Sequence, residues 1–175
     1  MPHSIRTERL VLQPCSRRHA PALWREIRDY AVMRNTSLWP YPLSYAHTLF
    51  MLSKLEPDST TDPVFAVVKS GEVAGTIGLH QRKDDTYTIG YMLGTRFWGG
   101  GIASEAVRAI CKFGFKQLRV GRILAEVYTD NPGSDRVLVK NGFVKRPGTT
   151  MGYSTARGHG FPITTWDLKP ERLRL

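Results

Sequence analysis

The stretch that most constrains the fold is residues 87–115, where a strand-like pattern, three consecutive glycines and a helix-like pattern follow one another. Every second residue from Tyr87 to Leu93 is large and apolar, which is the spacing of a β-strand. From Ile102 to Phe113, apolar residues recur every three or four positions, which is the spacing of an α-helix that buries one face. The sequence therefore predicts a strand, a glycine loop at 99–101 and a helix in direct succession.

A helix that begins directly after glycines is a candidate anion site. The first N–H groups of a helix have no partner within the helix and lie at the positive end of its dipole. Glycines lack the Cβ atom that would keep a phosphate away, and they tolerate positive φ angles. We therefore predict a pyrophosphate site at this loop; the alternative is that the glycines only form a turn between the strand and the helix.

Two common phosphate-binding patterns do not match this loop. The P-loop pattern G-x-x-x-x-G-K-[ST] aligns with Gly94 and Gly99 but meets Gly100 where it requires lysine. The dinucleotide pattern G-x-G-x-x-G aligns with Gly99 and Gly101 but meets Ser104 where it requires the third glycine. The ligand is therefore expected to belong to another class of phosphate compound.

Residues 96–101, RFWGGG, resemble the acetyl-CoA motif [QR]-x-x-G-x-[GA] of the GNAT acetyltransferases. The longer run through residue 106 is similar to the RimJ/RimL-like branch, as are the opening TERLVL at 7–12 and the pair NPGS and KNGF within 131–143. These motifs occur in the family's order and span most of the chain. The resemblance implies an α/β (α+β layered) GNAT acyl-CoA N-acyltransferase fold, with a mixed central sheet of about six to seven strands flanked by about four helices. It also implies one acetyltransferase domain over residues 1–175, as the length favours.

Outside the central stretch, periodicity and turn residues predict the other elements. Helices are expected at 20–33, 45–55 and 132–140. Strands are expected at 5–12, 64–69, 73–80 and 123–128, and a final pair begins at 143. Of that pair, 161–168 is the clearer strand, and the glycine-rich residues 148–160 are predicted to connect its two members.

Composition limits the function classes. The formal net charge is +10, but the basic residues are scattered and form no run interleaved with aromatics, so nucleic-acid binding is not favoured. No apolar run is long enough to cross a membrane, and no signal peptide is evident, so a cytoplasmic monomer or homodimer is expected. Cys15 and Cys111 are expected to be buried thiols. The histidines form no metal motif, so no metal is expected.

The resemblance assigns the cofactor acetyl-CoA to the gap between the strands at 89–93 and 123–128. Backbone groups at the edge of the first strand would bind the pantetheine arm, the glycine loop would bind the pyrophosphate, and Arg96 would add positive charge. The residues so implied are Met92, Leu93, Arg96, Gly99, Gly100, Gly101, Ile102, Ala103, Asn131 and Ser134.

Direct acetyl transfer needs a neutral amine and a proton for the departing thiolate. Ser134 matches the family serine near the thiol and is the candidate acid; the alternative is a capping or first-turn role in the helix that begins there. Thr88 stands where the RimJ/RimL-like pattern often has a glutamate, so the base is open. His80 is one candidate. The others are Asp84, Asp85, Glu126 or water alone.

The acceptor is a primary amine, and the resemblance favours a protein N-terminus. Small amines such as polyamines or aminoglycosides remain open. Trp39 and Tyr41 lie in the connection that borders the acceptor site in the family, where they either line the substrate pocket or fill the edge of the core. Because the glutamate is missing, an acetyl-CoA-binding module with little or no catalysis is the main alternative, and an RNA-binding protein is a weaker one.

Overall fold

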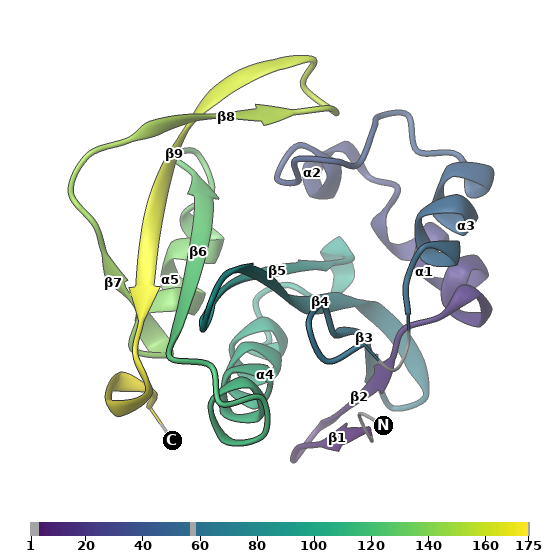
Figure 1. The fold of residues 1–175 in the computed structure, drawn as a ribbon. Coiled ribbons are helices and arrows are strands. Elements are labelled where there is room, and N and C mark those ends of the chain that lie inside the picture. Colours follow the sequence, from purple (N-terminus) through teal and green to yellow (C-terminus); the bar gives the residue numbers. More distant parts are fainter. Residues whose placement is uncertain (1–3, 57–58, 175) are drawn as a thin grey trace.

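The computed structural model describes residues 4–56 and 59–174, and within these residues the strands form one sheet of nine (Figure 1). The spatial order is β1-β2-β3-β4-β5-β6-β9-β7, and β8 also pairs with β9. The strands are β1 (Ile5–Arg6), β2 (Leu10–Pro14), β3 (Val64–Lys69), β4 (Glu72–Lys83), β5 (Thr86–Leu93), β6 (Arg122–Tyr128), β7 (Val144–Lys145), β8 (Thr150–Ser154) and β9 (His159–Leu168). All neighbours are antiparallel except β5 and β6, so the sheet is mixed, as predicted.

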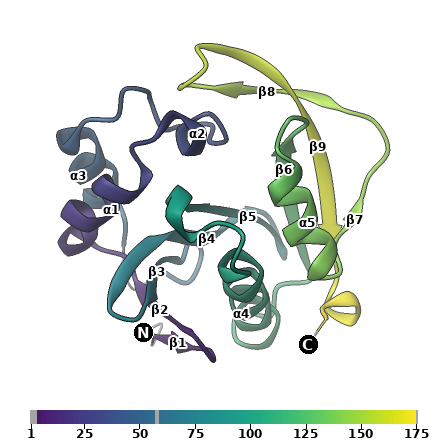
Figure 2. The same ribbon diagram turned by 180° about the vertical axis from the view of Figure 1, so that it is seen from behind.

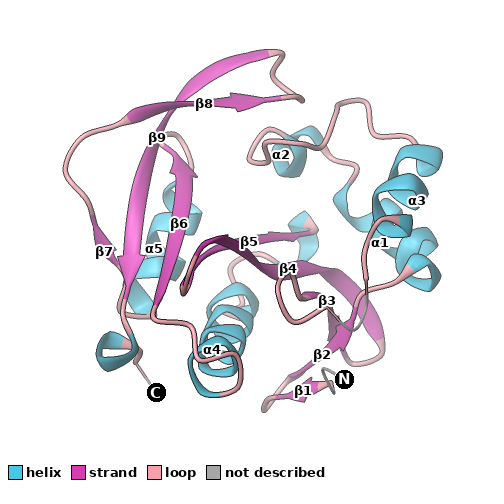
Figure 3. Cartoon of the chain, viewed as in Figure 1, coloured by secondary structure: helices cyan, strands magenta, loops and turns pink. Residues whose placement is uncertain are grey.

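Five α-helices flank this sheet in the described part of the chain (Figure 3). They are α1 (Ala20–Ile27), α2 (Tyr30–Met33), α3 (Tyr45–Ser53), α4 (Ile102–Lys116) and α5 (Pro132–Lys140). The view from behind in Figure 2 shows α4 and α5 side by side in front of the strands, with α1, α2 and α3 gathered at one side. None of these described helices is long and apolar enough to cross a membrane.

The alternation of side chains along β3 divides the core into two parts. Phe65 and Val67 belong to the apolar cluster that contains the buried face of α4, whereas Ala66 and Val68 belong to the cluster that contains α1 and α3. Phe65 is fully buried and meets Phe113 of α4 edge to face at 5.6 Å. Burial of a side chain of this size stabilises the fold by roughly 1.5–3 kcal/mol. The apolar face of α4 therefore packs against one face of the sheet, as the helix and strand periodicities of the sequence predict.

The parallel pair β5–β6 is short and sets the position of the site. Its register runs only from Thr86 opposite Arg122 to Thr88 opposite Leu124. Beyond Thr88, β5 continues to pair with β4 as far as Leu93, and β6 continues to pair with β9 as far as Tyr128. The two strands therefore diverge, and Figure 1 shows the β6–β9 half turned away from the β4–β5 half.

Three sequence predictions of local structure were wrong. The helix expected at 20–33 is broken, because Asp29 takes an extended conformation and its carboxylate accepts from the Ala31 N–H at 2.8 Å, which starts α2 anew. The first strand is divided by a turn in which the Thr7 N–H donates to the Leu10 carbonyl at 3.0 Å. The connector expected at 148–160 contains β8, whose partner is β9. These short pieces raise the strand count from six or seven to nine.

Candidate active site

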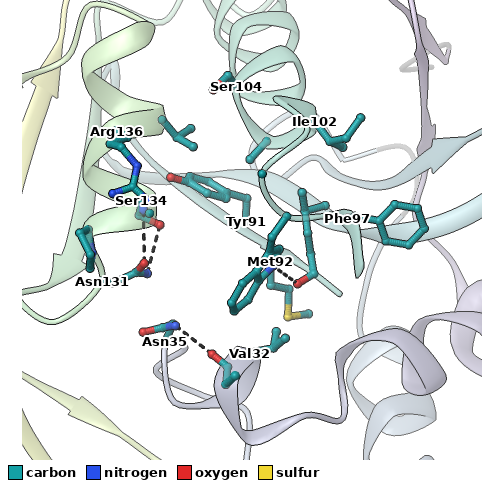
Figure 4. A pocket seen from close by; sticks show the side chains of 18 of the residues that line it. Val32, Asn35, Tyr91, Met92, Phe97, Ile102, Ser104, Asn131, Ser134 and Arg136 are labelled. Carbon is teal, nitrogen blue, oxygen red and sulfur yellow. Dashed lines mark hydrogen bonds between the residues drawn. The ribbon is translucent and has the colours of Figure 1, made fainter. Parts of the chain in front are cut away.

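A cavity of about 470 Å³ lies where β5 and β6 diverge (Figure 4). Four segments line it: α2 with the residues just after it, the last three residues of β5, the glycine loop with the first turn of α4, and one face of α5 with the loop before it. Its volume is within the range of small-molecule sites.

The end of β5 offers a strand edge to the cavity. Met92 and Leu93 are buried and line it, and their pairing with Thr76 and Gly75 of β4 leaves the opposite edge of β5 without a strand neighbour. Gly75 permits this close pairing, since a Cβ there would lie 2.0 Å from the Met92 carbonyl oxygen. An unpaired strand edge can bond an extended ligand as a further strand would.

The glycine loop carries backbone N–H groups at the start of α4. Gly99 and Gly101 both have φ of +78°, a left-handed conformation that favours glycine. The first bond of the helix ladder runs from the Glu105 N–H to the Gly101 carbonyl at 3.1 Å, which leaves the N–H groups of Ile102, Ala103 and Ser104 outside the ladder. All three residues line the cavity. Gly100, which the sequence analysis also assigned to the cofactor, does not line the cavity. Its φ is not positive, and its carbonyl accepts from Arg9 Nη1 at 2.9 Å.

The N-terminal TERL segment supports this loop from outside. Glu105 accepts from the Thr7 hydroxyl at 2.6 Å, from the Arg9 N–H at 2.9 Å and from Arg9 Nε at 2.7 Å. Burial alone raises the pKa of Glu105, but the bonds from Thr7 and Arg9 outweigh it and hold that pKa below its ordinary value. The carboxylate therefore stays charged and ties β1–β2 to the first turn of α4. This contact gives a physical reason for the two sequence motifs to occur together.

The start of α5 faces the start of α4 across the cavity. Asn131 is the cap of α5: its Oδ1 accepts from the Ser134 N–H at 3.2 Å, and its Nδ2 donates to Ser134 Oγ at 3.1 Å (Figure 4). Ser134 is thus a first-turn residue and not the cap, and its own hydroxyl proton is not used by Asn131. Both side chains line the cavity.

Two cations from α5 add charge to the same wall. Arg136 and Lys140 line the cavity one helical turn apart, and neither forms an ion pair with any residue that the structure describes. Together with the two helix N-termini they make this side of the cavity electropositive. The arrangement suits a ligand that carries several negative charges.

Arg96, by contrast, points away from the cavity. Its Nε and Nη2 each donate to the Glu26 carboxylate at 2.8 Å, and its Nη1 donates to Glu72 at 3.1 Å. The guanidinium lies 4.3 Å above the ring of Phe97 and faces α1. The sequence predicts that the charge of Arg96 lies near the phosphates of the cofactor, and the position of its side chain does not support this prediction. The charge instead holds the turn before the glycine loop against α1 and the β3–β4 turn.

The other side of the cavity is held by a side-chain cluster that we name the Arg34–Asp130–Arg157 cluster. Asp130 accepts from Arg157 at 2.8 and 3.0 Å and pairs with Arg34, and Arg157 Nε also donates to the Arg34 carbonyl at 2.8 Å. The Arg157 side chain is only 5% exposed, and its guanidinium lies over the rings of Phe161 at 4.2 Å and Tyr128 at 5.0 Å. The bond from Arg157 is the main cause that holds the pKa of Asp130 below its ordinary value.

The cluster joins segments that are distant in sequence. Arg157 lies in the turn between β8 and β9, and the adjacent Thr155 donates to the Ser37 carbonyl from its N–H at 3.0 Å and from its hydroxyl at 2.7 Å. Figure 1 shows the tip of this hairpin next to α2. Because Arg34, Asn35 and Asp130 line the cavity, the hairpin positions one of its walls.

The structure does not bring His80 into the cavity. His80 is exposed on β4, 3.5 Å from Asp62, and lies opposite Thr88 in the sheet. The Thr88 hydroxyl accepts from Arg82, which also pairs with Glu126 at 3.4 Å. The remaining candidate bases, Asp84 and Asp85, lie in the exposed turn between β4 and β5. None of these groups lines the cavity, so the structure offers no candidate base among them.

Trp39 and Tyr41 also lie outside the cavity. Trp39 is half-buried and packs against the α1–α3 part of the core, which matches the alternative that it fills the edge of the core. Tyr41 is 48% exposed and contacts Tyr30 edge to face at 5.0 Å. Their predicted role in substrate binding therefore has no support from their positions.

Sequence reasoning missed several residues that line the cavity. Arg136 and Lys140 carried a signal, since their four-residue spacing places both on one face of the predicted helix. Tyr91 lies within the motif stretch but was assigned no role. The wall residues Arg34, Asn35 and Asp130 carried no local signal, because separate loops bring them together.

The geometry can be compared with known proteins. Residues 9–144 match the family model described as the acetyltransferase (GNAT) domain. The chain belongs to the GNAT acetyltransferase family. The uncharacterized N-acetyltransferase p20 of Bacillus licheniformis is 31% identical over 170 residues, which covers 94% of this chain and 95% of that protein. The ribosomal-protein-serine acetyltransferase of Escherichia coli is 30% identical over 83 residues, 46% of each chain.

Solved structures agree on the fold. RimL, a ribosomal L7/L12 alpha-N-protein acetyltransferase solved in complex with coenzyme A, superposes with a TM-score of 0.82 at 21% identity over 95% of this chain and 97% of that one. A GNAT-family acetyltransferase from Bacillus anthracis has a TM-score of 0.80 at 24% identity over 96% and 99%. The predicted GNAT fold is thus confirmed, and the chain is an acetyl-CoA-dependent N-acetyltransferase of this family.

Proposed function

We propose that this acetyltransferase acetylates the free N-terminal amine of a protein or peptide. The assignment of acetyl-CoA as the cofactor rests on one observation: two helix N-termini and the open edge of β5 line the same cavity. A pyrophosphate fits the N–H groups of Ile102 and Ala103, the pantetheine arm fits the edge at Met92, and Arg136 and Lys140 suit the phosphate charges. One sheet containing strands from β1 to β9 supports a single catalytic domain over the chain.

The charge of the cavity supports an acceptor with few positive charges. Three basic residues line it, Arg34, Arg136 and Lys140, against the single acid Asp130. Asp130 is already paired with Arg34 and Arg157, so no carboxylate among the described lining residues is free to attract a cation. A polyamine or an aminoglycoside would therefore find no free carboxylate among these residues to bind its positive charges. The names of similar proteins, a ribosomal-protein-serine acetyltransferase and RimL, support a protein N-terminus.

The chemistry assigns one role to the chain's own side chains. Acetyl-CoA supplies the activated acetyl group as a thioester. The amine nitrogen forms a bond to the carbonyl carbon, the carbon–sulfur bond breaks, and sulfur keeps the electron pair. Ser134 lines the cavity and has a hydroxyl proton that Asn131 does not use, and it donates this proton to that sulfur. The sulfur gains the proton of Ser134. Because no lining residue is placed as a base, water accepts the amine proton, and water also returns a proton to Ser134, so the step balances.

The cofactor part is tested by thermal melting with saturating acetyl-CoA, NAD and ATP in parallel. A ligand at about 100 times its Kd adds ~2.7 kcal/mol of stability, which raises the Tm of a chain of this size by about 5–10 °C. We expect this shift with acetyl-CoA. No shift with acetyl-CoA, or a larger one with another nucleotide, would contradict the assignment of the glycine loop.

The acceptor part is tested by thiol release with a hexapeptide that begins with serine. Its N-acetylated form is the matched control, and spermidine represents the polycations. We expect release with the free peptide alone and a rate that rises with pH as the amine loses its proton. Release with spermidine but not with the peptide would reject the acceptor and leave the cofactor assignment intact.

A further inference from the structure

Tyr91 has a buried hydroxyl that no described group satisfies. It lies on β5 and lines the cavity. Its hydroxyl oxygen is shielded from solvent and has no hydrogen bond of normal geometry to a described residue, although it lies near enough to the Ser134 hydroxyl for that group to act on its pKa. Figure 4 shows its ring lying between the glycine-loop side and α5, with the oxygen turned toward Ser134. A buried polar group without a partner is rare in a folded protein. Its persistence beside the reacting groups points to a role in the reaction.

The hydrogen-bonding capacity of Ser134 defines what Tyr91 can do. A serine hydroxyl has one proton to donate and two lone pairs that accept. Asn131 Nδ2 already donates to one lone pair at 3.1 Å. If a second group donated to the other lone pair, both acceptor positions of Ser134 would be occupied. The serine O–H would then point into the cavity. The Tyr91 hydroxyl, which is turned toward Ser134 in Figure 4, is the candidate for this second donor.

The surroundings of Tyr91 keep it in the donor form. Burial is the main cause that raises its pKa far above the ordinary value; nearby Asp135 and Cys111 act in the same direction, and Ser134 acts against them. Cys111 is itself fully buried, and burial raises its pKa as well. Tyr91 is therefore a neutral phenol over the whole working range, with a proton to donate.

We propose that Tyr91 is a positioning residue that donates a hydrogen bond to Ser134 Oγ and, together with Asn131, aims the Ser134 proton into the cavity. The inference rests on the proposed function, in which Ser134 donates to the leaving sulfur. The balance of the step is unchanged: the carbon–sulfur bond breaks, sulfur keeps the electron pair, and the proton it gains equals the one the amine loses. Tyr91 keeps its own proton throughout and fixes only the direction of Ser134.

Tyr87 provides a matched control. It lies four residues earlier on β5 and therefore on the same face of the strand, it is 6% exposed, and it belongs to the main core. It does not line the cavity. Tyr87→Phe therefore removes a hydroxyl of the same kind from the same strand without a path to Ser134.

The first test uses coenzyme A itself and needs no acceptor. The pKa of the bound thiol is measured from the ultraviolet absorbance of the thiolate in the wild type and in the variants. A hydrogen bond from Ser134 stabilises the thiolate, so Tyr91→Phe and Ser134→Ala are each expected to raise the thiol pKa by about one unit. The double variant should show no further rise, and Tyr87→Phe should match the wild type. A Tyr91→Phe titration equal to that of the wild type overturns the proposal.

The second test separates positioning from folding. Tyr91→Phe is expected to lower kcat about ten-fold with the KM for acetyl-CoA unchanged, and to add less than about two-fold in the Ser134→Ala background. Its Tm should fall by no more than about 2–4 °C, because the change removes a single hydrogen bond. A lower Tm with an unchanged kcat, or fully additive losses, overturns the proposal. Wild-type protein that binds no coenzyme A would instead reject the proposed function itself.

Discussion

The two sides of the cavity are built in different ways. The side assigned to acetyl-CoA is mainly backbone from one continuous stretch, from the end of β5 through the glycine loop to the first turn of α4. The opposite side depends on the Arg34–Asp130–Arg157 cluster, whose bonds join residues 96 and 123 positions apart. The first side takes its shape mainly from local backbone conformation, with Glu105 and Arg96 supporting it from outside, whereas the second depends on a few side chains.

This difference explains what each side reveals in the sequence. Backbone sites need glycines at positive φ and a change of period from two to 3.6, and both leave a visible local pattern. A side-chain cluster needs only that three suitable residues meet in space, which no local pattern records. The two sides should therefore also fail in different ways when they are altered.

The largest effect is expected from Arg157→Gln. The change removes a 5%-exposed guanidinium that bonds Asp130 twice and the Arg34 carbonyl once, which should cost about 2 kcal/mol of stability. For a chain of this size, that corresponds to a fall in Tm of roughly 4–8 °C. The KM for the serine hexapeptide should rise, while the Tm increase caused by acetyl-CoA should persist. Calorimetry and steady-state kinetics measure both effects.

Arg146→Gln is the control, because Arg146 also pairs with a carboxylate, that of Asp167 on β9, but at a site away from the cavity. pH gives a second check. The lowered pKa of Asp130 means that its pairing stabilises the fold above the ordinary aspartate pKa and is lost as pH falls toward the folded value. The difference in Tm between the wild type and Arg157→Gln should therefore shrink below about pH 4. A constant difference, or loss of the acetyl-CoA effect, would show that the two sides are not separable.

The extent of sequence-based prediction follows the same division. The fold class, the glycine loop and α4 were predictable, since each depends on local spacing and on positions such as Gly101. β8 was missed because its residues alternate weakly and only pairing with β9 makes them a strand. Arg96 was assigned to the phosphate because a motif gives a residue type but not the direction of its side chain, which Glu26 and Glu72 determine here. Tyr91 was overlooked because an unsatisfied hydroxyl is visible only in three dimensions.

A smaller effect is expected from Gly101→Ala on the cofactor side. Gly101 has φ of +78° at the start of α4, where a side chain costs about 1–2 kcal/mol, and an added Cβ would also lie 3.3 Å from Arg9 Nη2. If the loop shifts to relieve this strain, affinity for acetyl-CoA should fall about ten-fold. Gly100→Ala is the matched control, since its φ is not positive and an added Cβ meets no atom within 4 Å. Isothermal titration should separate the two variants; equal losses would mean that proximity to the ligand, and not backbone conformation, controls this loop.

The smallest effect compares two arginines, one predicted from the sequence and one found in the structure. Arg136→Gln removes a cation that lines the cavity without an ion-pair partner among the described residues, so acetyl-CoA affinity should fall about two- to five-fold at low salt and less at high salt. Arg96→Gln removes a charge already bound to Glu26 and Glu72, so the same affinity should remain within about two-fold, with any loss appearing in Tm. Binding measured at two salt concentrations tests both. A larger, salt-dependent loss in Arg96→Gln than in Arg136→Gln would mean that Arg96 turns toward the phosphate when acetyl-CoA binds, and the cofactor side would then depend on a mobile side chain as well as on its backbone.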